Sequence, residues 1–422
     1  MNKQIIEKCT DIYIDELGFT EQRTTIARYI NELICNLTEH YEKQGVKSVS
    51  AKQDNFKHYI LKPNEDGDYS LPEFLMNRLF YNVRKIEFGE CGGNKGQYDA
   101  FQKSVALDMQ KIRNQFHNLH DMQGDDTESV TARETAVKKV IMHEFEHALK
   151  TQFIVDGKGT EPSPQYVGLA RNLRQIDKGA INLRANIEQG GRFCDSTEVH
   201  CGLHIPNGSP IADKGFRTPW DGNESHHNMD EIFNESESLV MASMTYGKPN
   251  LKPQAYKVFA DRNCFPLYNL ESSNFAITQF GFLLKEVIGQ KESFEGMYLN
   301  PTKMFETFNK NYQDIFDNNL TKDEWRGKKP WEQLQRYIAE IKATGNEKDY
   351  LHLTNLLAQC LERKVMAEID KTTKTDLMRT LNNFRVHSMT NDDRGKLHAL
   401  PHYKILLSLK QKVAEKEEQV TR

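Results

Sequence analysis

Several features that would assign a chain to a familiar class are missing from this sequence. Its 422 residues contain no apolar run of the roughly 18 residues that a membrane-spanning helix needs. The opening segment, MNKQIIEKCTDIYIDELGF, lacks the apolar core of a signal peptide. We therefore expect a cytoplasmic protein without a membrane span.

Neither the charge nor the cysteines indicate a specialised class. The formal net charge is −4 and the basic residues are dispersed along the chain, which argues against nucleic-acid binding. The seven cysteines are an odd number with scattered spacing, so free thiols in a reducing compartment are expected. The glycines between residues 89 and 96 are followed by no G-K-S/T, which excludes a phosphate loop there.

What the sequence does contain is a mainly helical pattern with short strands, which predicts an α+β fold. One apolar series near the N-terminus has helical spacing, and Gly45 ends it. The series consists of Ile26, Ile30, Leu33, Ile34 and Leu37. A turn or linker is predicted over 63–67, and alternating residues predict a strand over 81–88. Residues 104–109 are a second short strand candidate.

Longer helices are predicted in the middle and in the last third of the chain. The segment 131–153 is the clearest of them, with Thr131 as its N-cap and Glu134 as the partner in a capping box. A second helix is predicted from Met229 to Gly247, and the pattern is helical again beyond residue 290. The two tryptophans near Pro330 are expected to anchor helix packing.

The first of these helices carries the pentapeptide His143-Glu144-Phe145-Glu146-His147. Residues four apart on a helix share a face, so both imidazoles can reach one metal ion. A catalytic Zn²⁺ takes three protein ligands, and a neighbouring carboxylate such as Glu144 can act as general base. This H-E-x-x-H arrangement is the zinc-protease signature, although Glu146 is not a motif position and is expected at the surface or behind the ligands.

A third protein ligand has to come from elsewhere in the sequence. The extended motif H-E-x-x-H-x-x-G-x-x-H is excluded, because Lys150 and Phe153 stand at its glycine and last histidine positions. An aspartate in a later G-T-x-x-D is disfavoured, because Ser163 occupies its place. The remaining option is a glutamate on a separate downstream helix.

Asn234-Glu235-Ser236-Glu237-Ser238 fits that option, and here the chain resembles the gluzincin metallopeptidases. The resemblance implies a zincin-like domain in which Glu235 is the third zinc ligand and Ser238 orients a ligand. The segment is also similar to the ligand helix of anthrax lethal factor, a bacterial toxin protease. Leu239 departs from the usual aspartate, the gap after His147 is long, and Glu237 stays open as the alternative ligand.

Two further groups of residues are candidates for the site. His227, beside His226, or Tyr246 would stabilise the oxyanion, because gluzincins often use a histidine or tyrosine for this. A second group, of cysteines and histidines, could bind a structural zinc. The preferred interpretation is that this stretch forms a strand that lines the substrate cleft. This second group consists of Cys194, His200, Cys201 and His204.

Together these observations predict a helical region over 1–75, a zincin-like metallopeptidase domain over 76–290 and a helical region over 291–422. The expected activity is zinc-dependent cleavage of a protein or peptide. The alternative is a non-catalytic, zinc-containing protein-interaction module. Under either hypothesis, the C-terminal helices after residue 290 are candidates for binding a partner protein. The chain also resembles bacterial effector proteases secreted into host cells, and an ordinary intracellular bacterial peptidase is the alternative setting.

Overall fold

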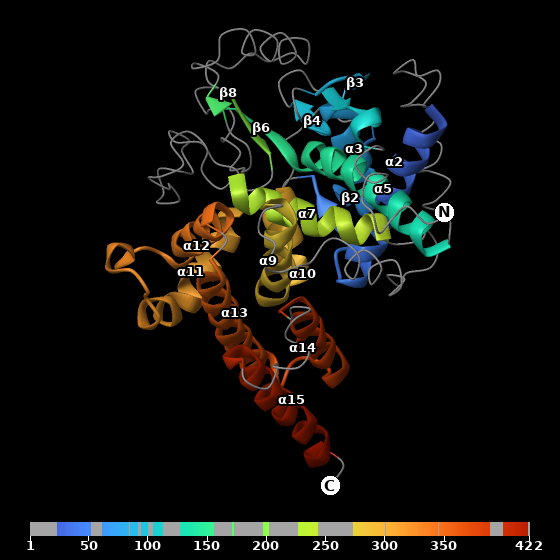
Figure 1. Ribbon diagram of the computed structural model, residues 1–422. Coiled ribbons are helices and arrows are strands. Elements are labelled where there is room, and N and C mark those ends of the chain that lie inside the picture. Colours follow the sequence, from blue (N-terminus) through green and yellow to red (C-terminus); the bar gives the residue numbers. More distant parts are fainter. Residues whose placement is uncertain are drawn as a thin grey trace. The chain divides into compact units, whose positions relative to one another are not determined.

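The structure is a computed structural model, mainly helical with three small β-sheets in the part that it describes (Figure 1). The α+β, mainly helical fold class is therefore confirmed. The described residues are 23–51, 61–83, 85–91, 94–99, 104–112, 127–155, 171–172, 197–201, 227–243, 273–299, 301–344, 346–388 and 400–420.

The first described element is helix α2 (Arg23–Lys43), which confirms the predicted N-terminal helix. All five residues of its apolar series are at most 1% exposed, because their spacing brings them to one face. Gly45 follows with a φ of 89°, a left-handed conformation that suits glycine after a helix. Strands β1 (Ser48–Ser50) and β2 (Asp68–Ser70) then form an antiparallel pair.

Helix α3 (Leu71–Asn82) begins with a capping box, in which the backbone N–H and the hydroxyl of Ser70 both donate to Glu73. The prediction of a strand over 81–88 is wrong at its start, because this helix runs on through Asn82. Only Lys85–Phe88 forms a strand, β3. The helix continues because it buries Phe74, Leu75 and Leu79, which outweighs a few alternating residues.

Strand β3 belongs to a three-stranded sheet with the order β3-β5-β4. The central strand β5 (Ser104–Leu107) is parallel to β3 and antiparallel to β4 (Gly96–Asp99). The strand predicted over 104–109 is thus confirmed for its first four residues. Strand β4 lies at the sheet edge and contacts helix α5.

Helix α5 (Thr127–Lys150) carries the H-E-x-x-H motif and packs beside α2 and α3 (Figure 1). Thr131 was expected to cap it, but the helix begins at Thr127, so that prediction is wrong. The helix also ends at Lys150 rather than at residue 153. There Thr151–Val155 becomes strand β6, whose β-branched and aromatic residues favour pairing in a sheet.

Strand β6 pairs antiparallel with β8 (Thr197–Cys201), which also pairs with β7 (Arg171–Asn172). The prediction of a strand at His200 is confirmed for the residues of β8, whereas Cys194 and His204 lie outside the described residues. Helix α7 (His227–Ser243) confirms the second central helix, and its predicted end at Gly247 is also outside the described part.

The last third of the chain is helical, as predicted. Its elements are α9 (Ser273–Ile288), α10 (Gln290–Phe294), the π-helix η5 (Glu295–Leu299), α11 (Pro301–Asn318), the 3₁₀-helix η6 (Asp323–Trp325), α12 (Pro330–Thr344), α13 (Glu347–Glu368), α14 (Lys374–Ser388) and α15 (Pro401–Val420). Trp331 lies 4.6 Å from Phe305 between ring centroids, and Trp325 lies 4.5 Å from Tyr337. Both tryptophans are 1% exposed, which confirms them as packing anchors.

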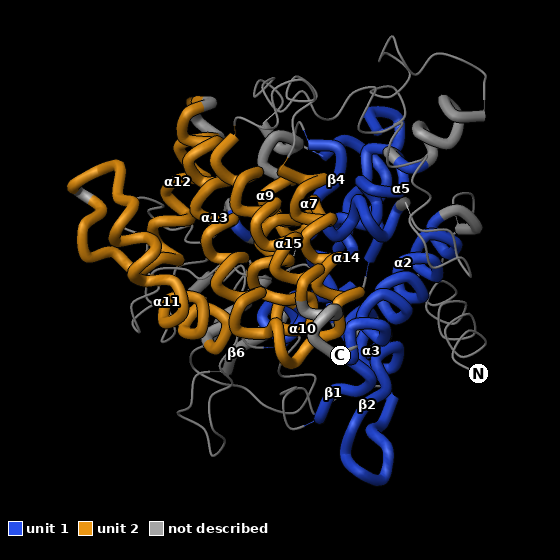
Figure 2. The backbone as a smooth tube through the Cα atoms, turned by 90° about the horizontal axis from the view of Figure 1, so that it is seen from below, with its two compact units in different colours: residues 1–230, 237–263, 294–302 blue, residues 231–236, 264–293, 303–422 orange. Residues whose placement is uncertain are grey.

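The chain divides into two compact units (Figure 2). Unit 1 comprises Met1–Asp230, Glu237–Asn263 and Phe294–Thr302, and unit 2 comprises Glu231–Ser236, Cys264–Ser293 and Lys303–Arg422. The three predicted regions along the sequence stay a prediction.

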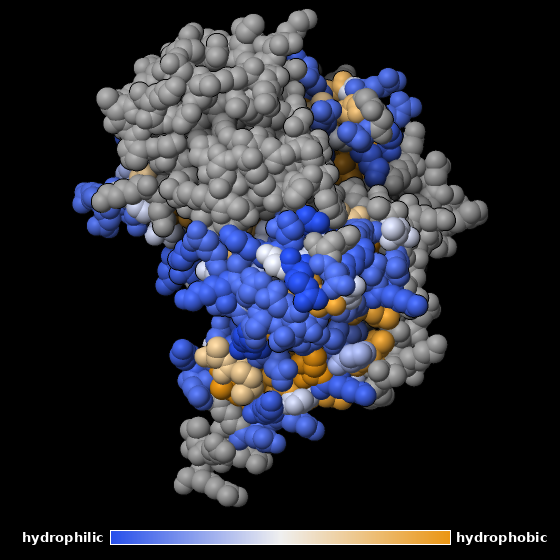
Figure 3. All heavy atoms as spheres, turned by 90° about the vertical axis from the view of Figure 1, so that its left-hand side faces the viewer, coloured by the Kyte–Doolittle hydropathy of each residue, from blue (hydrophilic) through white to orange (hydrophobic). Residues whose placement is uncertain are grey.

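The surface of the described residues is largely hydrophilic on the face that Figure 3 shows, with a smaller hydrophobic area on its lower part. The large apolar side chains exposed to solvent are few among the described residues. They are Phe88, Met366, Val386 and Leu407. None of the described helices combines the length and apolar character that crossing a membrane requires.

Candidate metal centre

Helix α5 places its two motif histidines next to one another at the C-terminal end of the helix. The Nε2 atoms of His143 and His147 are 3.1 Å apart, and the two rings meet edge to face. Two nitrogens held by one tetrahedral zinc at about 2.0–2.1 Å lie about 3.3 Å apart. The imidazoles are therefore already separated by nearly the distance that a shared zinc requires.

A carboxylate from helix α7 completes this group. His143, His147 and Glu231 each offer a ligand atom, and these three atoms all lie within 4.8 Å of one another. His143 is buried, whereas the other two are half-buried. Two imidazoles and one carboxylate form a donor set that suits a catalytic zinc, which needs three protein ligands and an open position.

The resemblance to the gluzincins implies Glu235 as the third ligand, and this implication stays a prediction. Glu235 is 8% exposed and stands four residues after Glu231, so the two share a face of α7. The alternative, Glu237, has other partners. Its Oε2 lies 2.6 Å from the Lys150 ammonium and accepts a hydrogen bond from Tyr298, and its Oε1 accepts one from Tyr41.

Glu144, the expected general base, lies against strand β4. A Cβ atom added to Gly96 would stand 2.7 Å from Cγ of Glu144 and 2.9 Å from its Oε1. In its present position the carboxyl group of Glu144 has room only because residue 96 is glycine, and Glu144 is itself 8% exposed. The carboxylate of Glu144, the residue that follows the first motif histidine, thus lies next to the backbone of the edge strand β4.

A buried group of charged and phenolic side chains lies directly beyond the histidines, and sequence reasoning missed it. It consists of Tyr41, Glu146, Lys150, Glu237 and Tyr298, all at most 1% exposed. Of the two positions expected for Glu146, the surface is wrong, since the residue is fully buried 3.7 Å from Lys150, and the position behind the ligands stays a prediction. Two features of the sequence could have indicated the ion pair of Lys150 with Glu237. Lys150 lies one turn after His147, and N-E-S-E-S contains a second glutamate.

Burial and charge together keep the two tyrosines of this group protonated. Burial, first, and the negative charge of Glu237, second, raise the pKa of Tyr41 well above its usual value. The same two causes, in the same order, raise the pKa of Tyr298. Both hydroxyls therefore remain neutral donors to Glu237 at any physiological pH.

The side chains of the predicted oxyanion residues and of the second candidate metal cluster lie outside the described part of the structure, so both assignments stay predictions. His227 is the first residue of α7, and its side chain is not among those described. Tyr246 lies outside the described residues. His200 and Cys201 belong to strand β8, whose backbone alone is described.

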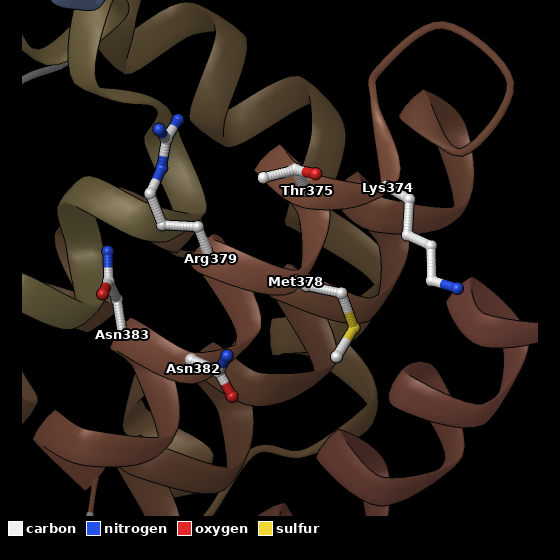
Figure 4. A pocket seen from close by; sticks show the side chains of 6 residues that line it. All are labelled: Lys374, Thr375, Met378, Arg379, Asn382 and Asn383. Carbon is white, nitrogen blue, oxygen red and sulfur yellow. The ribbon is translucent and has the colours of Figure 1, made fainter.

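Helix α14 carries a hollow in the described part of the structure (Figure 4). It is lined by Lys374, Thr375, Met378, Arg379, Asn382 and Asn383. The side chains of Lys374 and Arg379 point away from one another, so they do not converge on a common ligand. Asn382 accepts a hydrogen bond from Lys410, and Asn383 donates one to Glu286. This hollow lacks a convergent set of reactive groups.

The chain matches no protein-family model, no curated protein and no solved structure.

Proposed function

We propose that the chain is a zinc-dependent peptidase of gluzincin type, in which His143, His147 and a glutamate of α7 hold the metal. The observation that carries this proposal is the 3.1 Å approach of the two Nε2 atoms, with a carboxylate oxygen of Glu231 inside the same 4.8 Å group. Such convergence of two buried or half-buried imidazoles with a carboxylate is costly unless the three groups share a proton or a cation.

When bound, zinc supplies a Lewis acid that polarises the scissile carbonyl and makes a water molecule acidic. Glu144 is the residue of this chain that would take the proton from the attacking water and pass it to the leaving amine. Its position against Gly96 supports this role, because the close contact restricts where the carboxylate can lie. A general base that is held in one orientation toward the attacking water is more effective than one that samples many orientations.

A peptide substrate is favoured by the edge strand beside Glu144. Strand β4 ends the described three-stranded sheet, so the backbone groups of its outer side are not paired within that sheet. An extended peptide can add to such an edge by main-chain hydrogen bonds. A substrate bound in this way would run past the carboxylate that has to receive the proton.

The decisive experiment compares purified wild type with Glu144→Gln, using Glu87→Gln on strand β3 as the matched control. Wild type and both variants should bind one zinc by elemental analysis. Glu144→Gln should lose turnover by about 10²–10⁴-fold, the usual contribution of a general base, whereas Glu87→Gln should retain it. Because the substrate is unknown, turnover is measured as new N-termini generated in a cell proteome.

Three outcomes would count against the proposal. A wild type that binds no zinc removes the metal site, and a Glu144→Gln variant as active as wild type removes the mechanism. Bound zinc without any cleavage would instead support the non-catalytic, protein-binding module.

The third ligand is identified by a parallel measurement of zinc affinity. Glu231→Gln and Glu235→Gln each remove one carboxylate charge from the same face of α7. The variant that loses the ligand should bind zinc at least about tenfold more weakly, while the other should change far less. The bacterial-effector setting and the assignment of the oxyanion residue stay predictions beside this proposal.

A further inference from the structure

Helices α5 and α7 are joined by a buried ion pair close to their proposed metal ligands. The ammonium of Lys150 and Oε2 of Glu237 are 2.6 Å apart, at 0% and 1% exposure. Lys150 follows His147 by three residues, which is about 4.5 Å along the helix axis. Glu237 follows Glu235 by two residues, or about 3 Å. The ion pair thus connects the two helices within one turn of these residues.

Two tyrosines from other elements hold the glutamate of this pair. Tyr41 of α2 donates to Oε1 of Glu237, and Tyr298 of the π-helix η5 donates to Oε2 at 3.2 Å. The tyrosines are in turn fixed by Phe294, whose ring centroid lies 4.7 Å from each of theirs. Both oxygens of Glu237 therefore have defined partners that come from three different elements.

Further buried hydrogen bonds link α7, α5 and η5 to the neighbouring helices α2 and α3. Asn36 of α2 donates to the carbonyl of Met241 on α7 at 2.9 Å, and Asn82 of α3 donates to the carbonyl of Ala148 on α5 at 2.7 Å. Arg78 of α3 donates to the carbonyl of Tyr298 at 3.2 Å. Each bond fixes the axial position of a helix, which apolar contacts define less sharply because they are not directional.

We infer that Lys150 and Glu237, held by Tyr41 and Tyr298, are positioning residues that set the register of α7 against α5 for metal binding. Zinc accepts its nitrogen and oxygen ligands only within about 2.0–2.2 Å, so a small shift of one helix would lower its affinity. This inference rests on the metal site of the proposed function and not on its peptidase chemistry.

Stability alone is a poor explanation of such a group. Replacing a buried ion pair by apolar residues of similar size is often neutral or stabilising. Helices elsewhere in the chain are joined by aromatic contacts such as that of Trp331 with Phe305. A lysine with two glutamates is instead directional, and it fixes one relative position of the two helices.

The test uses two conservative variants, Tyr41→Phe and Tyr298→Phe, because removal of Lys150 itself could unfold the protein. Each variant deletes one hydroxyl that donates to Glu237 and leaves the ring in place. The matched control is Tyr337→Phe, since Tyr337 is also 1% exposed and its hydroxyl lies 2.8 Å from that of Thr321, far from this group in the sequence.

The readout is the dissociation constant for zinc, measured by competition with a chelator, with the folded fraction verified by urea unfolding. Tyr41→Phe and Tyr298→Phe should each weaken zinc binding about tenfold, and the double variant by about 10–100-fold, the range seen when groups behind metal ligands are removed. Tyr337→Phe should lose comparable stability and leave zinc affinity unchanged.

Equal zinc affinity in all three single variants would overturn the inference, because the hydroxyls would then contribute to folding alone. A wild type that binds no zinc would overturn both the inference and the metal site. A wild type that binds zinc but cleaves no peptide would defeat the peptidase proposal only, and the affinity series would still decide the role of the tyrosines.

Discussion

Beside its apolar residues, the core around helices α5 and α7 contains charged side chains that are almost fully buried, whereas the core around helices α11 to α13 contains two buried tryptophans. In the first, Glu146, Lys150 and Glu237 are at most 1% exposed. In the second, aromatic rings such as Trp325 and Trp331 fill the interior. A well-defined ion pair of the second region, that of Arg363 with Asp314, is at the surface with 40% and 60% exposed side chains.

The two kinds of buried side chain have different physical effects, since one stabilises the fold and the other defines the relative position of helices. Aromatic burial removes large apolar area from water and stabilises helices with few constraints on their exact positions. Buried charges gain little net stability and are tolerated only when each one has its partners in place. The charged core is therefore the region in which geometry is most tightly specified, and it adjoins the candidate metal centre.

The largest expected effect comes from removing the cation of the charged core. Lys150→Met keeps most of the volume but leaves Glu146 and Glu237 without the ammonium that both adjoin. Loss of one partner of a buried pair costs about 3–5 kcal/mol, and urea unfolding would measure it. A decrease of less than about 1 kcal/mol in the free energy of unfolding would mean that the buried ion pair contributes no more than an exposed one.

An added methyl group beside Glu144 should affect activity more than stability. In Gly96→Ala the new Cβ displaces the end of the Glu144 side chain, which can move without distorting the backbone. A misplacement of about 1 Å can lower turnover about 100-fold. Proteome cleavage and zinc content are the measurements, and Gly89→Ala, with open space around its Cβ, is the control. Unchanged turnover in Gly96→Ala would show that the contact is not needed.

The free energy of unfolding is expected to depend on pH through His387, a histidine of the helical region that the fold keeps neutral. The ring stacks on Phe282 with centroids 3.9 Å apart, and burial lowers its pKa to about 3. The unfolded chain, with a histidine pKa of about 6.5, then binds the proton more readily than the folded chain. Stability should therefore fall as the pH falls from about 6.5 towards 3, by up to about 1.4 kcal/mol per pH unit from this group.

The measurement compares urea unfolding of wild type and His387→Phe at several pH values in this window. The variant keeps an aromatic ring beside Phe282 but cannot take up a proton. Its stability should decline less steeply than that of wild type as the pH is lowered. Parallel stability curves would show that His387 does not titrate differently in the folded and unfolded chains.

The smallest effect is expected at the surface ion pair of the helical region. Nη2 of Arg363 lies 2.5 Å from Oδ2 of Asp314, and the hydrogen bond from this guanidinium lowers the pKa of Asp314. Exposed pairs contribute about 1 kcal/mol or less, because water and salt screen them. Arg363→Met should thus reduce the free energy of unfolding far less than Lys150→Met does.

Local sequence rules predicted the long elements well and their ends less well. The apolar series of α2 and the turn near Gly67, with its φ of 81°, follow from local spacing and from glycine's conformational freedom. The boundary between α3 and β3 did not follow, because the residues that α3 buries extend this helix into the alternating segment. The start of α5 at Thr127 did not follow from the predicted cap either. The tertiary environment also decided that Glu146 is buried, which its position in the motif did not indicate.

The sequence by itself determined that His143 and His147 share a helix face, since a spacing of four residues fixes this in any α-helix. It likewise determined that Glu144 adjoins the first of them. Only the tertiary structure decided which α7 carboxylate joins the imidazoles in the 4.8 Å group and which one pairs with Lys150. Such choices depend on how one helix is placed against another, and that is set by contacts between residues far apart in the chain.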